Sequence, residues 1–183
     1  MPVNAPNNEL NWIAPHFNLT NIDNKMVSLD KAKGTNGTVI VFICNHCPYV
    51  KAIAKRLKNE ADELLQHSIA TIAVMSNDVE NYPEDSFDNM IKFSEKFGFN
   101  FPYLYDDTQE IAKKYGAVCT PDFFGFDKNL KLKYRGRIDS GTMENIDTKK
   151  INRELYNAMI KIKDEGTGPN EQYNSIGCSI KWK

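Results

Sequence analysis

The feature that most constrains the fold is a buried-strand pattern followed directly by a helical pattern and then by a second apolar strand pattern. Residues 38–43 form a continuous β-branched and apolar run, typical of a strand that is covered on both faces. Over residues 48–66, apolar side chains recur every three or four positions between lysines and glutamates, as in an amphipathic helix. Residues 69–75 are apolar again. This order predicts a β-α-β unit with parallel strands and a right-handed crossover.

The other segments predict a central mixed β-sheet flanked by helices on both faces, which is an α/β fold. We expect an N-terminal hairpin near residues 17–19 and 26–29, a helix over 84–97, an extended piece over 101–105, a helix over 108–115, an antiparallel hairpin of 123–126 and 130–134, and a closing helix over 147–163. The chain is then one domain, residues 1–165, with an irregular C-terminal tail, residues 166–183. We expect this tail to pack on the domain or on a partner subunit.

Composition narrows the class of partner. The 183 residues carry a formal charge of −1, whereas a nucleic-acid-binding surface is basic, so we expect no nucleic-acid partner. No apolar run approaches the roughly 20 residues of a spanning helix, so we expect no membrane partner. Residues 1–14 lack the basic start and apolar stretch of a signal peptide, which favours a cytoplasmic location.

Two cysteines lie where the first strand of the β-α-β unit meets the helix, in the segment Cys44-Asn45-His46-Cys47-Pro48. This edge of a parallel sheet forms a crevice, and the start of a helix favours an anion such as a thiolate. C-x-x-C motifs at helix starts lower the pKa of a cysteine by roughly one to several units. Pro48 suits the first helical turn because it has no N–H to leave unpaired.

From this placement we predict a redox site with Cys44 and Cys47 as its catalytic residues. Cys44 lies at the exposed mouth and attacks, while Cys47, in the first turn, resolves the mixed disulfide. Asn45 and Pro48 shape the site, and a protonated His46 would stabilise the thiolate. The alternatives are two merely buried cysteines or half of a zinc site. Zinc needs two more ligands, and we expect the His46 ring to point away from a metal held by its neighbours, so no metal or cofactor is predicted.

A second segment of interest surrounds Thr120 and Pro121. A proline that opens a strand is tolerated at a sheet edge or in a specialised turn, and spacing alone favours an ordinary trans bond. Cys119 is either an additional thiol of the site or a small core residue. Cys178, in the tail, is either a distant resolving thiol or, as we favour, a structural residue.

Taken together, these residues resemble the thioredoxin superfamily over about residues 10–163. A subgroup, the peroxiredoxin-like redoxins of the alkyl-hydroperoxide-reductase/thiol-specific-antioxidant (AhpC/TSA) type, is similar over nearly the whole chain. The similar motifs are Cys-Asn-His-Cys-Pro-Tyr-Val at 44–50, Ser-Asn-Asp at 76–78, Tyr-Pro-Glu-Asp-Ser at 82–86, Tyr-Gly-Ala-Val-Cys-Thr-Pro at 115–121, Tyr-Arg-Gly-Arg at 134–137 and Gly-Cys-Ser-Ile-Lys-Trp at 177–182.

The resemblance implies a thioredoxin-like fold in which the Thr120–Pro121 bond is cis, packs against the disulfide and docks the substrate chain. The sequence also departs from both families. Thr38 stands where thioredoxin has its buried acid, and Ile40 and Cys44 stand where peroxiredoxins have a Pro and a Thr or Ser. The candidates for the peroxiredoxin Arg are Arg135 and Arg137.

Three functions are therefore weighed. The leading one is a thiol–disulfide oxidoreductase that acts on a protein or small-molecule disulfide and is recycled by a thioredoxin- or glutathione-like partner. The second is a thiol peroxidase with an antioxidant role, in which Cys47 becomes the sulfenic acid and Cys44 resolves it. The third is a thiol module that binds copper(I) or zinc. A homodimer is a further candidate assembly.

Overall fold

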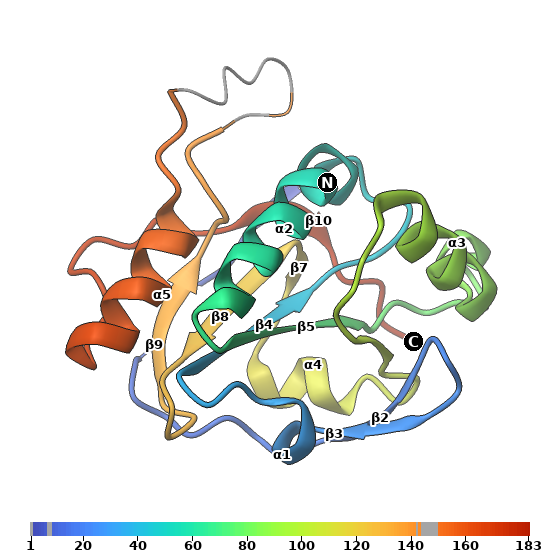
Figure 1. Cartoon of the computed structure of the whole chain (residues 1–183). Helices are drawn as coiled ribbons and strands as arrows, with labels where there is room; N and C mark the ends of the chain where they lie inside the picture. Colours follow the sequence, from blue (N-terminus) through green and yellow to red (C-terminus); the bar gives the residue numbers. More distant parts are fainter. Residues whose placement is uncertain (1, 7–8, 142, 144–149) are drawn as a thin grey trace.

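The structure, a computed structural model, describes residues 2–6, 9–141, 143 and 150–183. A seven-stranded mixed sheet lies at its centre, with strand order β3-β2-β6-β5-β4-β8-β9 (Figure 1). Strands β4, β5 and β6 are mutually parallel, and the remaining neighbours pair antiparallel. The strands are β2 (Asn18–Asn21), β3 (Met26–Ser28), β4 (Gly37–Phe42), β5 (Ile69–Met75), β6 (Tyr103–Tyr105), β8 (Asp122–Phe126) and β9 (Leu132–Gly136).

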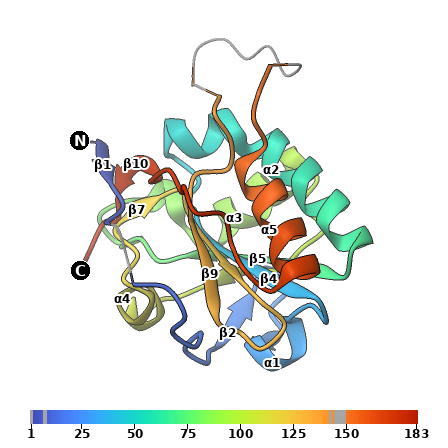
Figure 2. The same ribbon diagram turned by 90° about the vertical axis from the view of Figure 1, so that its left-hand side faces the viewer.

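Helices cover both faces of this sheet, as Figures 1 and 2 show. One core lies between the sheet and α2 (Pro48–Gln66), α3 (Phe87–Phe97) and α5 (Glu154–Glu165). A second core lies on the opposite face, against α4 (Glu110–Tyr115) and the chain before β2. A further short helix, α1 (Leu29–Ala32), follows β3. These layers confirm the predicted mixed sheet with helices on both faces.

The β-α-β unit forms as predicted, because its sequence pattern reports burial directly. All six residues of β4 are buried, as expected for a strand covered on both faces. Helix α2 begins at Pro48 and ends at Gln66, the predicted bounds. Its buried side chains recur at helical spacing and include Val50, Ile53 and Leu57. The unit therefore fixes the junction of strand and helix on which both cysteines lie.

The helix predicted over 108–115 starts at Glu110, and two other predicted helices begin still later than the sequence indicated. The first breaks at Ser86, whose backbone is extended, so a 3-10 turn, η1 (Pro83–Asp85), precedes α3. The predicted helix over 147–163 starts at Glu154 in the structure, and residues 147–149 lie outside the described residues. Asn152 instead pairs with Ser140 through two hydrogen bonds, which hold it out of a helix.

The irregular tail contains a strand that the sequence did not reveal. Strand β10 (Ile176–Ser179) lies between β1 (Pro2–Asn4) and β7 (Cys119–Thr120) and pairs antiparallel with each. Figure 2 shows these three strands side by side at one edge of the molecule. The tail thus packs on its own domain, beside the segment that contains Thr120. Among the described residues, no helix combines the length and apolar character required to cross a membrane.

Candidate active site

Both predicted cysteines lie at the start of α2. Cys44 follows β4 after a single residue, and Cys47 is the N-cap residue, directly before Pro48 in the first turn. Thr120 contacts both thiols: its Oγ1 is 3.4 Å from Cys44 Sγ, and its carbonyl oxygen is 3.2 Å from Cys47 Sγ, from which it accepts a hydrogen bond while Cys47 is protonated. The structure therefore brings together the two segments that the sequence singled out.

The prediction that Cys44 lies at an exposed mouth is wrong. Cys44 and Cys47 both have an exposed fraction of 0%, and both belong to the core beneath α2. The physical reason is that Thr120 and strand β10 pack over the start of the helix, where the sequence indicated an open crevice. A substrate reaches either sulfur only when part of this cover moves.

The two thiols influence each other's ionisation, and the first proton is lost more readily from Cys47. The pKa of Cys47 is lowered, chiefly because the Cys44 thiol donates a hydrogen bond to its sulfur. The Cys178 thiol and the backbone N–H groups of Val50 and Cys178 lower it further, against the effect of burial. The pKa of Cys44 is raised by this hydrogen bond, by burial and by the charge of Asp85. These directions of the two pKa values differ from the prediction that Cys44 is the ionised thiol.

A buried carboxylate next to the site is the main functional residue that the sequence reasoning missed. Asp85 has no solvent exposure and accepts hydrogen bonds from the backbone N–H groups of Asn45 (2.7 Å) and His46 (3.2 Å). It also accepts a bond from Asn77 Nδ2 at 2.8 Å. Asp85 thus supplies the buried acid that is absent at Thr38. Its only signal in the sequence was its place in the motif at 82–86.

His46 lies between this carboxylate and the thiol pair. Its Nδ1 is 2.6 Å from Asp85 Oδ2 and 3.9 Å from Cys44 Sγ. The ring is stacked on Tyr82, with centroids 5.9 Å apart, and its side chain keeps 25% exposure. His46 therefore connects Asp85 with Cys44 and with solvent.

Asn45 holds the loop between the two cysteines in place. Its side-chain nitrogen donates to the Glu84 carbonyl at 3.3 Å, and its side-chain oxygen accepts a hydrogen bond from Tyr103 at 2.9 Å. Burial, followed by the nearby Cys44 and Asp85, raises the pKa of Tyr103, so this hydroxyl stays a hydrogen-bond donor. The loop is thus fixed from both η1 and β6.

Three potential ligand atoms meet at this point. Cys44 Sγ, a ring nitrogen of His46 and a carboxylate oxygen of Asp85 all lie within 4.8 Å of one another. The ring therefore faces the same space as Cys44, contrary to the expectation that it points away. Asp85 is already engaged by two backbone N–H groups and the side chains of His46 and Asn77. We therefore infer that these three side chains do not bind a metal, and that Asp85 positions His46 and the thiol pair.

The Thr120–Pro121 bond is cis, as the resemblance implies. The backbone edge beside it, however, is already paired within the chain, because Thr120 lies opposite Cys178 and Cys119 lies opposite Ser179. Strand β10 therefore takes the position that the resemblance assigns to a substrate chain. In this structure Thr120 meets the tail on one side and the thiol pair on the other.

The two remaining cysteines differ in their surroundings. Cys119 is fully buried, its sulfur lies 3.7 Å from the Pro121 carbonyl oxygen, and burial raises its pKa. Cys178 is half-buried, packs against the core that contains Cys44 and Cys47, and interacts with the Cys47 thiol. Cys178, rather than Cys119, is thus the thiol beside the pair.

The candidate arginines are engaged elsewhere in the described structure. Arg135 forms a buried ion pair with Asp122 at 2.7 Å. Arg137 makes a bidentate pair with Glu154 at 2.7 and 2.8 Å. These pairs direct both guanidinium groups to carboxylates, and the groups that lower the pKa of Cys47 are its thiol neighbours and the backbone N–H groups of Val50 and Cys178.

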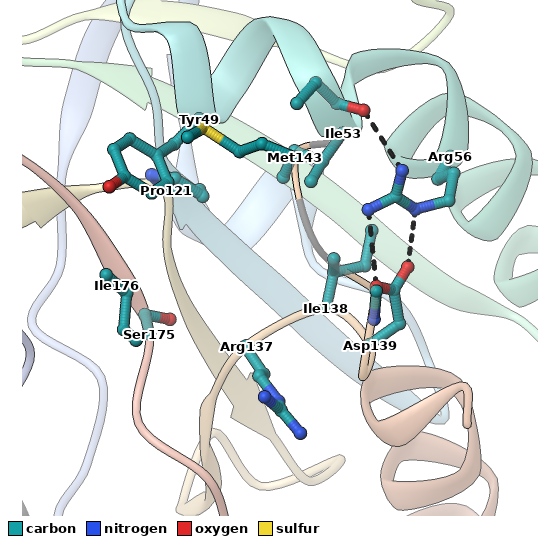
Figure 3. A pocket seen from close by; sticks show the side chains of 12 residues that line it. Tyr49, Ile53, Arg56, Pro121, Arg137, Ile138, Asp139, Met143, Ser175 and Ile176 are labelled. Atoms are coloured by element: carbon teal, nitrogen blue, oxygen red, sulfur yellow. Dashed lines mark hydrogen bonds and ion pairs between the residues drawn. The ribbon is translucent and has the colours of Figure 1, made fainter. Parts of the chain in front are cut away.

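A cavity of about 450 Å³ opens beside the site (Figure 3). Tyr49, Pro121 and Ile176 line it, and each is within two residues of Cys47, Thr120 or Cys178. The charged groups around it are largely paired: Arg56 binds Asp139 at 2.6 Å, and Arg137 binds Glu154. The cavity is therefore suited to an uncharged, largely apolar group. It is lined by Tyr49, Ala52, Ile53, Arg56, Pro121, Arg137, Ile138, Asp139, Gly141, Met143, Ser175 and Ile176.

Comparisons with known proteins identify the family and the fold. The model of the AhpC/TSA family matches residues 11–135. An uncharacterized conserved protein from Geobacillus kaustophilus has a crystal structure that is 44% identical, with a TM-score of 0.92, covering 100% of this chain and 97% of that one. The thioredoxin domain of a thiol-disulfide oxidoreductase from Bacteroides vulgatus shares the fold, with a TM-score of 0.65 at 16% identity over 86% of this chain and all of that one.

One curated relative has a described activity. The thiol-disulfide oxidoreductase ResA of Geobacillus thermodenitrificans is 39% identical over 61 residues, a match that spans 33% of this chain and 33% of that protein. The family model itself matches well over half of the present chain. The chain therefore belongs to the AhpC/TSA family and is a redox enzyme, an oxidoreductase with a thioredoxin-like fold.

Proposed function

We propose that this protein is a thiol–disulfide oxidoreductase that exchanges electrons between the Cys44–Cys47 pair and a disulfide in a protein or small molecule. The observation that carries the proposal is the pair itself: two thiols at the start of α2, one of them favoured as a thiolate by its neighbour. A thiolate beside a second thiol is the arrangement that disulfide exchange requires.

The exchange proceeds in two balanced steps. The Cys47 thiolate attacks one sulfur of the substrate disulfide, forming a mixed disulfide and releasing the other sulfur as a thiolate. Cys44 then loses its proton and attacks the Cys47 sulfur, which releases the second substrate sulfur and leaves a Cys44–Cys47 disulfide. The substrate gains two electrons and two protons, and a thioredoxin- or glutathione-like thiol partner later returns the pair to the reduced state.

Asp85 and His46 hold the loop beside Cys44 during the second step. His46 Nδ1 lies 3.9 Å from Cys44 Sγ and 2.6 Å from Asp85 Oδ2. Because Nδ1 donates its hydrogen to the Asp85 carboxylate, it has no lone pair that could take the Cys44 proton. The Cys44 proton passes instead to the substrate thiolate that was released in the first step.

The cavity beside Pro121 is the proposed docking site for the substrate next to its disulfide. Its lining is largely apolar, and the Arg56 and Arg137 charges near it are paired with carboxylates. A protein disulfide flanked by an apolar side chain fits this chemistry better than a highly charged small disulfide does. Docking there places the substrate beside the cover that must move.

The test is insulin reduction with a dithiol as the electron source. We expect Cys44→Ser and Cys47→Ser each to abolish turnover, because the exchange needs both sulfurs. Cys119→Ala, which removes a core thiol away from the pair, is the matched control and should keep the wild-type rate. A Cys47→Ser protein that still reduces insulin at the wild-type rate contradicts the proposal.

A thiol peroxidase is the second candidate, with an antioxidant role. It is favoured by the negative charge on Cys47 and by the AhpC/TSA match. Peroxide would oxidise Cys47 to the sulfenic acid, and Cys44 would condense with it, releasing water and forming the disulfide. The measurement is the second-order rate of peroxide consumption. A rate no faster than that of free cysteine thiolate excludes this function.

The cellular location and the partners of the enzyme are also part of the proposal. A cytoplasmic location would supply the reducing partner that recycling needs. The absence of nucleic-acid and membrane partners, and the homodimer, stay predictions from the sequence.

A further inference from the structure

Strand β10 of the tail packs directly against strand β7, whose residue Thr120 contacts both catalytic thiols. In the β7–β10 pairing, Cys178 lies directly opposite Thr120, whose Oγ1 and carbonyl oxygen contact Cys44 and Cys47. The approach is so close that a Cβ atom on Gly177 would lie 1.9 Å from the Thr120 carbonyl oxygen. Only glycine fits at that position, so the sequence before Cys178 permits this contact.

The Cys178 side chain meets the pair and also reaches the surface. Its thiol interacts with that of Cys47, and it packs against the core to which Cys44 and Cys47 belong. Cys44 and Cys47 have an exposed fraction of 0%, whereas Cys178 is half-buried. Of the three cysteines that meet here, Cys178 is thus the residue that is not fully buried.

We propose that Cys178 is a third redox-active thiol, which exchanges with the Cys44–Cys47 disulfide at the Cys47 sulfur and carries electrons between the buried pair and an external thiol partner. The inference rests on the proposed function, since the pair must first be oxidised by a substrate. It assigns the tail a part in the reaction cycle, in place of the structural role favoured from the sequence.

The step moves a disulfide without net oxidation. The Cys178 thiolate attacks Cys47 Sγ, so that a Cys47–Cys178 bond forms while the Cys44–Cys47 bond breaks. Cys44 leaves as a thiolate and takes up the proton that Cys178 lost. An external dithiol then attacks the sulfur of the half-buried Cys178, and its second thiol completes the reduction. Both cysteines end as thiols, and the external partner ends as a disulfide.

The charges around Cys178 favour this order of events. In the reduced protein, burial and then the Cys47 neighbour raise the pKa of Cys178 to about 11, so Cys178 stays a thiol. Once Cys47 is in a disulfide it carries no charge, so it no longer contributes to the raised pKa of Cys178. Cys178 is therefore more readily ionised when the pair is oxidised, which is when the exchange is needed.

The experiment uses the Cys44→Ser protein, in which Cys47 and Cys178 remain. The reduced protein is treated with one equivalent of 5,5′-dithiobis(2-nitrobenzoic acid), quenched with acid, alkylated and cut at lysines. We expect the aryl adduct to be lost and peptide 34–51 to be linked to peptide 164–181. The adduct should disappear at least about tenfold faster than in Cys44→Ser/Cys178→Ser, because a neighbouring thiol has a high effective concentration.

Two variants control for effects on the strand and on the other thiol. In the Cys44→Ser protein, adding Ser179→Ala changes the same strand without removing a thiol and should leave the link intact. Adding Cys119→Ala should also leave it intact. Circular dichroism checks the fold of each variant, and serine is close in size to the cysteine that it replaces.

The inference is overturned if the adduct persists on Cys47 or Cys178, if no adduct or link forms, or if peptide 34–51 joins peptide 115–128, which carries Cys119. Its failure is distinguishable from failure of the proposed function. A wild-type protein that reduces insulin and forms only the Cys44–Cys47 disulfide keeps that function and excludes the role of Cys178.

Discussion

At the scale of single residues, the site depends on which of two sulfurs loses its proton more readily. Cys47 is the N-cap residue of α2 and has the Cys44 and Cys178 thiols as hydrogen-bonding neighbours, whereas Cys44 lies near the Asp85 carboxylate. The helix start and the donors favour an anion at Cys47, and the carboxylate opposes one at Cys44. The nucleophile is thus chosen by neighbours, three of which (Asp85, Thr120 and Cys178) come from distant parts of the chain.

The pH dependence of alkylation tests this assignment. The pKa of Cys47 is held below that of an ordinary thiol, mainly by the hydrogen bond from Cys44, so Cys47 stays ionised at lower pH than a free thiol does. The rate of its alkylation by iodoacetamide should therefore stay nearly level from pH 9 to pH 7 and fall only at more acid pH. Mass spectrometry of peptide 34–51 identifies the labelled sulfur. A rate that climbs steadily from pH 7 to pH 9 at Cys47 contradicts the assignment.

Replacing the buried acid tests its influence on Cys44. Asp85→Asn removes a negative charge that raises the pKa of Cys44, so that pKa should fall and the reduced pair should be stabilised. The reduction potential should then rise, with each 1.4 kcal/mol of stabilisation corresponding to about 30 mV. Equilibration with a glutathione buffer measures the potential. Glu84→Gln, an exposed neighbour, is the matched control, and an equal shift in both variants would count against a specific role for Asp85.

At the scale of elements, the main unexpected feature is strand β10, because the tail sequence has no regular period and did not indicate a strand. It pairs with β7 and β1, and through β7 it closes the start of α2. The close approach at Gly177 makes this edge sensitive to a single methyl group. The short strand that covers the start of α2 is therefore also the strand that contains Cys178.

Gly177→Ala should detach this strand. The added Cβ would lie 1.9 Å from the Thr120 oxygen and 2.5 Å from its carbonyl carbon, so β10 must move away from β7. Hydrogen exchange should become faster over residues 176–179, and Cys47 should be alkylated faster because its cover is loosened. Ser179→Ala, on the same strand, should change neither. Unchanged exchange in Gly177→Ala would show that β10 does not depend on this contact.

At the scale of the whole molecule, the cavity exists only because distant parts of the chain meet. Helix α2 supplies Ala52 and Ile53, the β7–β8 junction supplies Pro121, and the tail supplies Ile176. The same packing buries the thiol pair directly beside it. Substrate selection and access are therefore properties of the assembled domain, not of any one element.

Filling the cavity should separate docking from chemistry. Ala52→Trp places a large ring among its lining residues and should raise KM for a protein disulfide such as insulin several-fold, with little change in kcat. Reaction of Cys47 with a small disulfide reagent should stay close to wild type. Lys51→Ala, an exposed change beside it on α2, is the control. An unchanged KM for insulin would show that substrates dock elsewhere.

The sequence by itself determined the local features of this protein, namely the secondary structure of the β-α-β unit and the position of the two cysteines in it. The β-α-β unit follows from hydrophobic periodicity, which reports the burial of each element, and the place of Cys44 and Cys47 follows from the strand–helix junction. The start of the last helix did not follow from periodicity, because Asn152 is held by Ser140, which lies outside its own segment.

Only the tertiary structure decided which groups meet at that junction. Asp85 reaches Asn45 and His46 across some 40 positions of chain, and Cys178 reaches Cys47 across more than 130. Local patterns carry no information on such contacts, since they depend on how the layers pack and on where an irregular tail finds an open strand edge. For the same reason the burial of the pair and the sulfur that holds the charge follow from the folded chain alone.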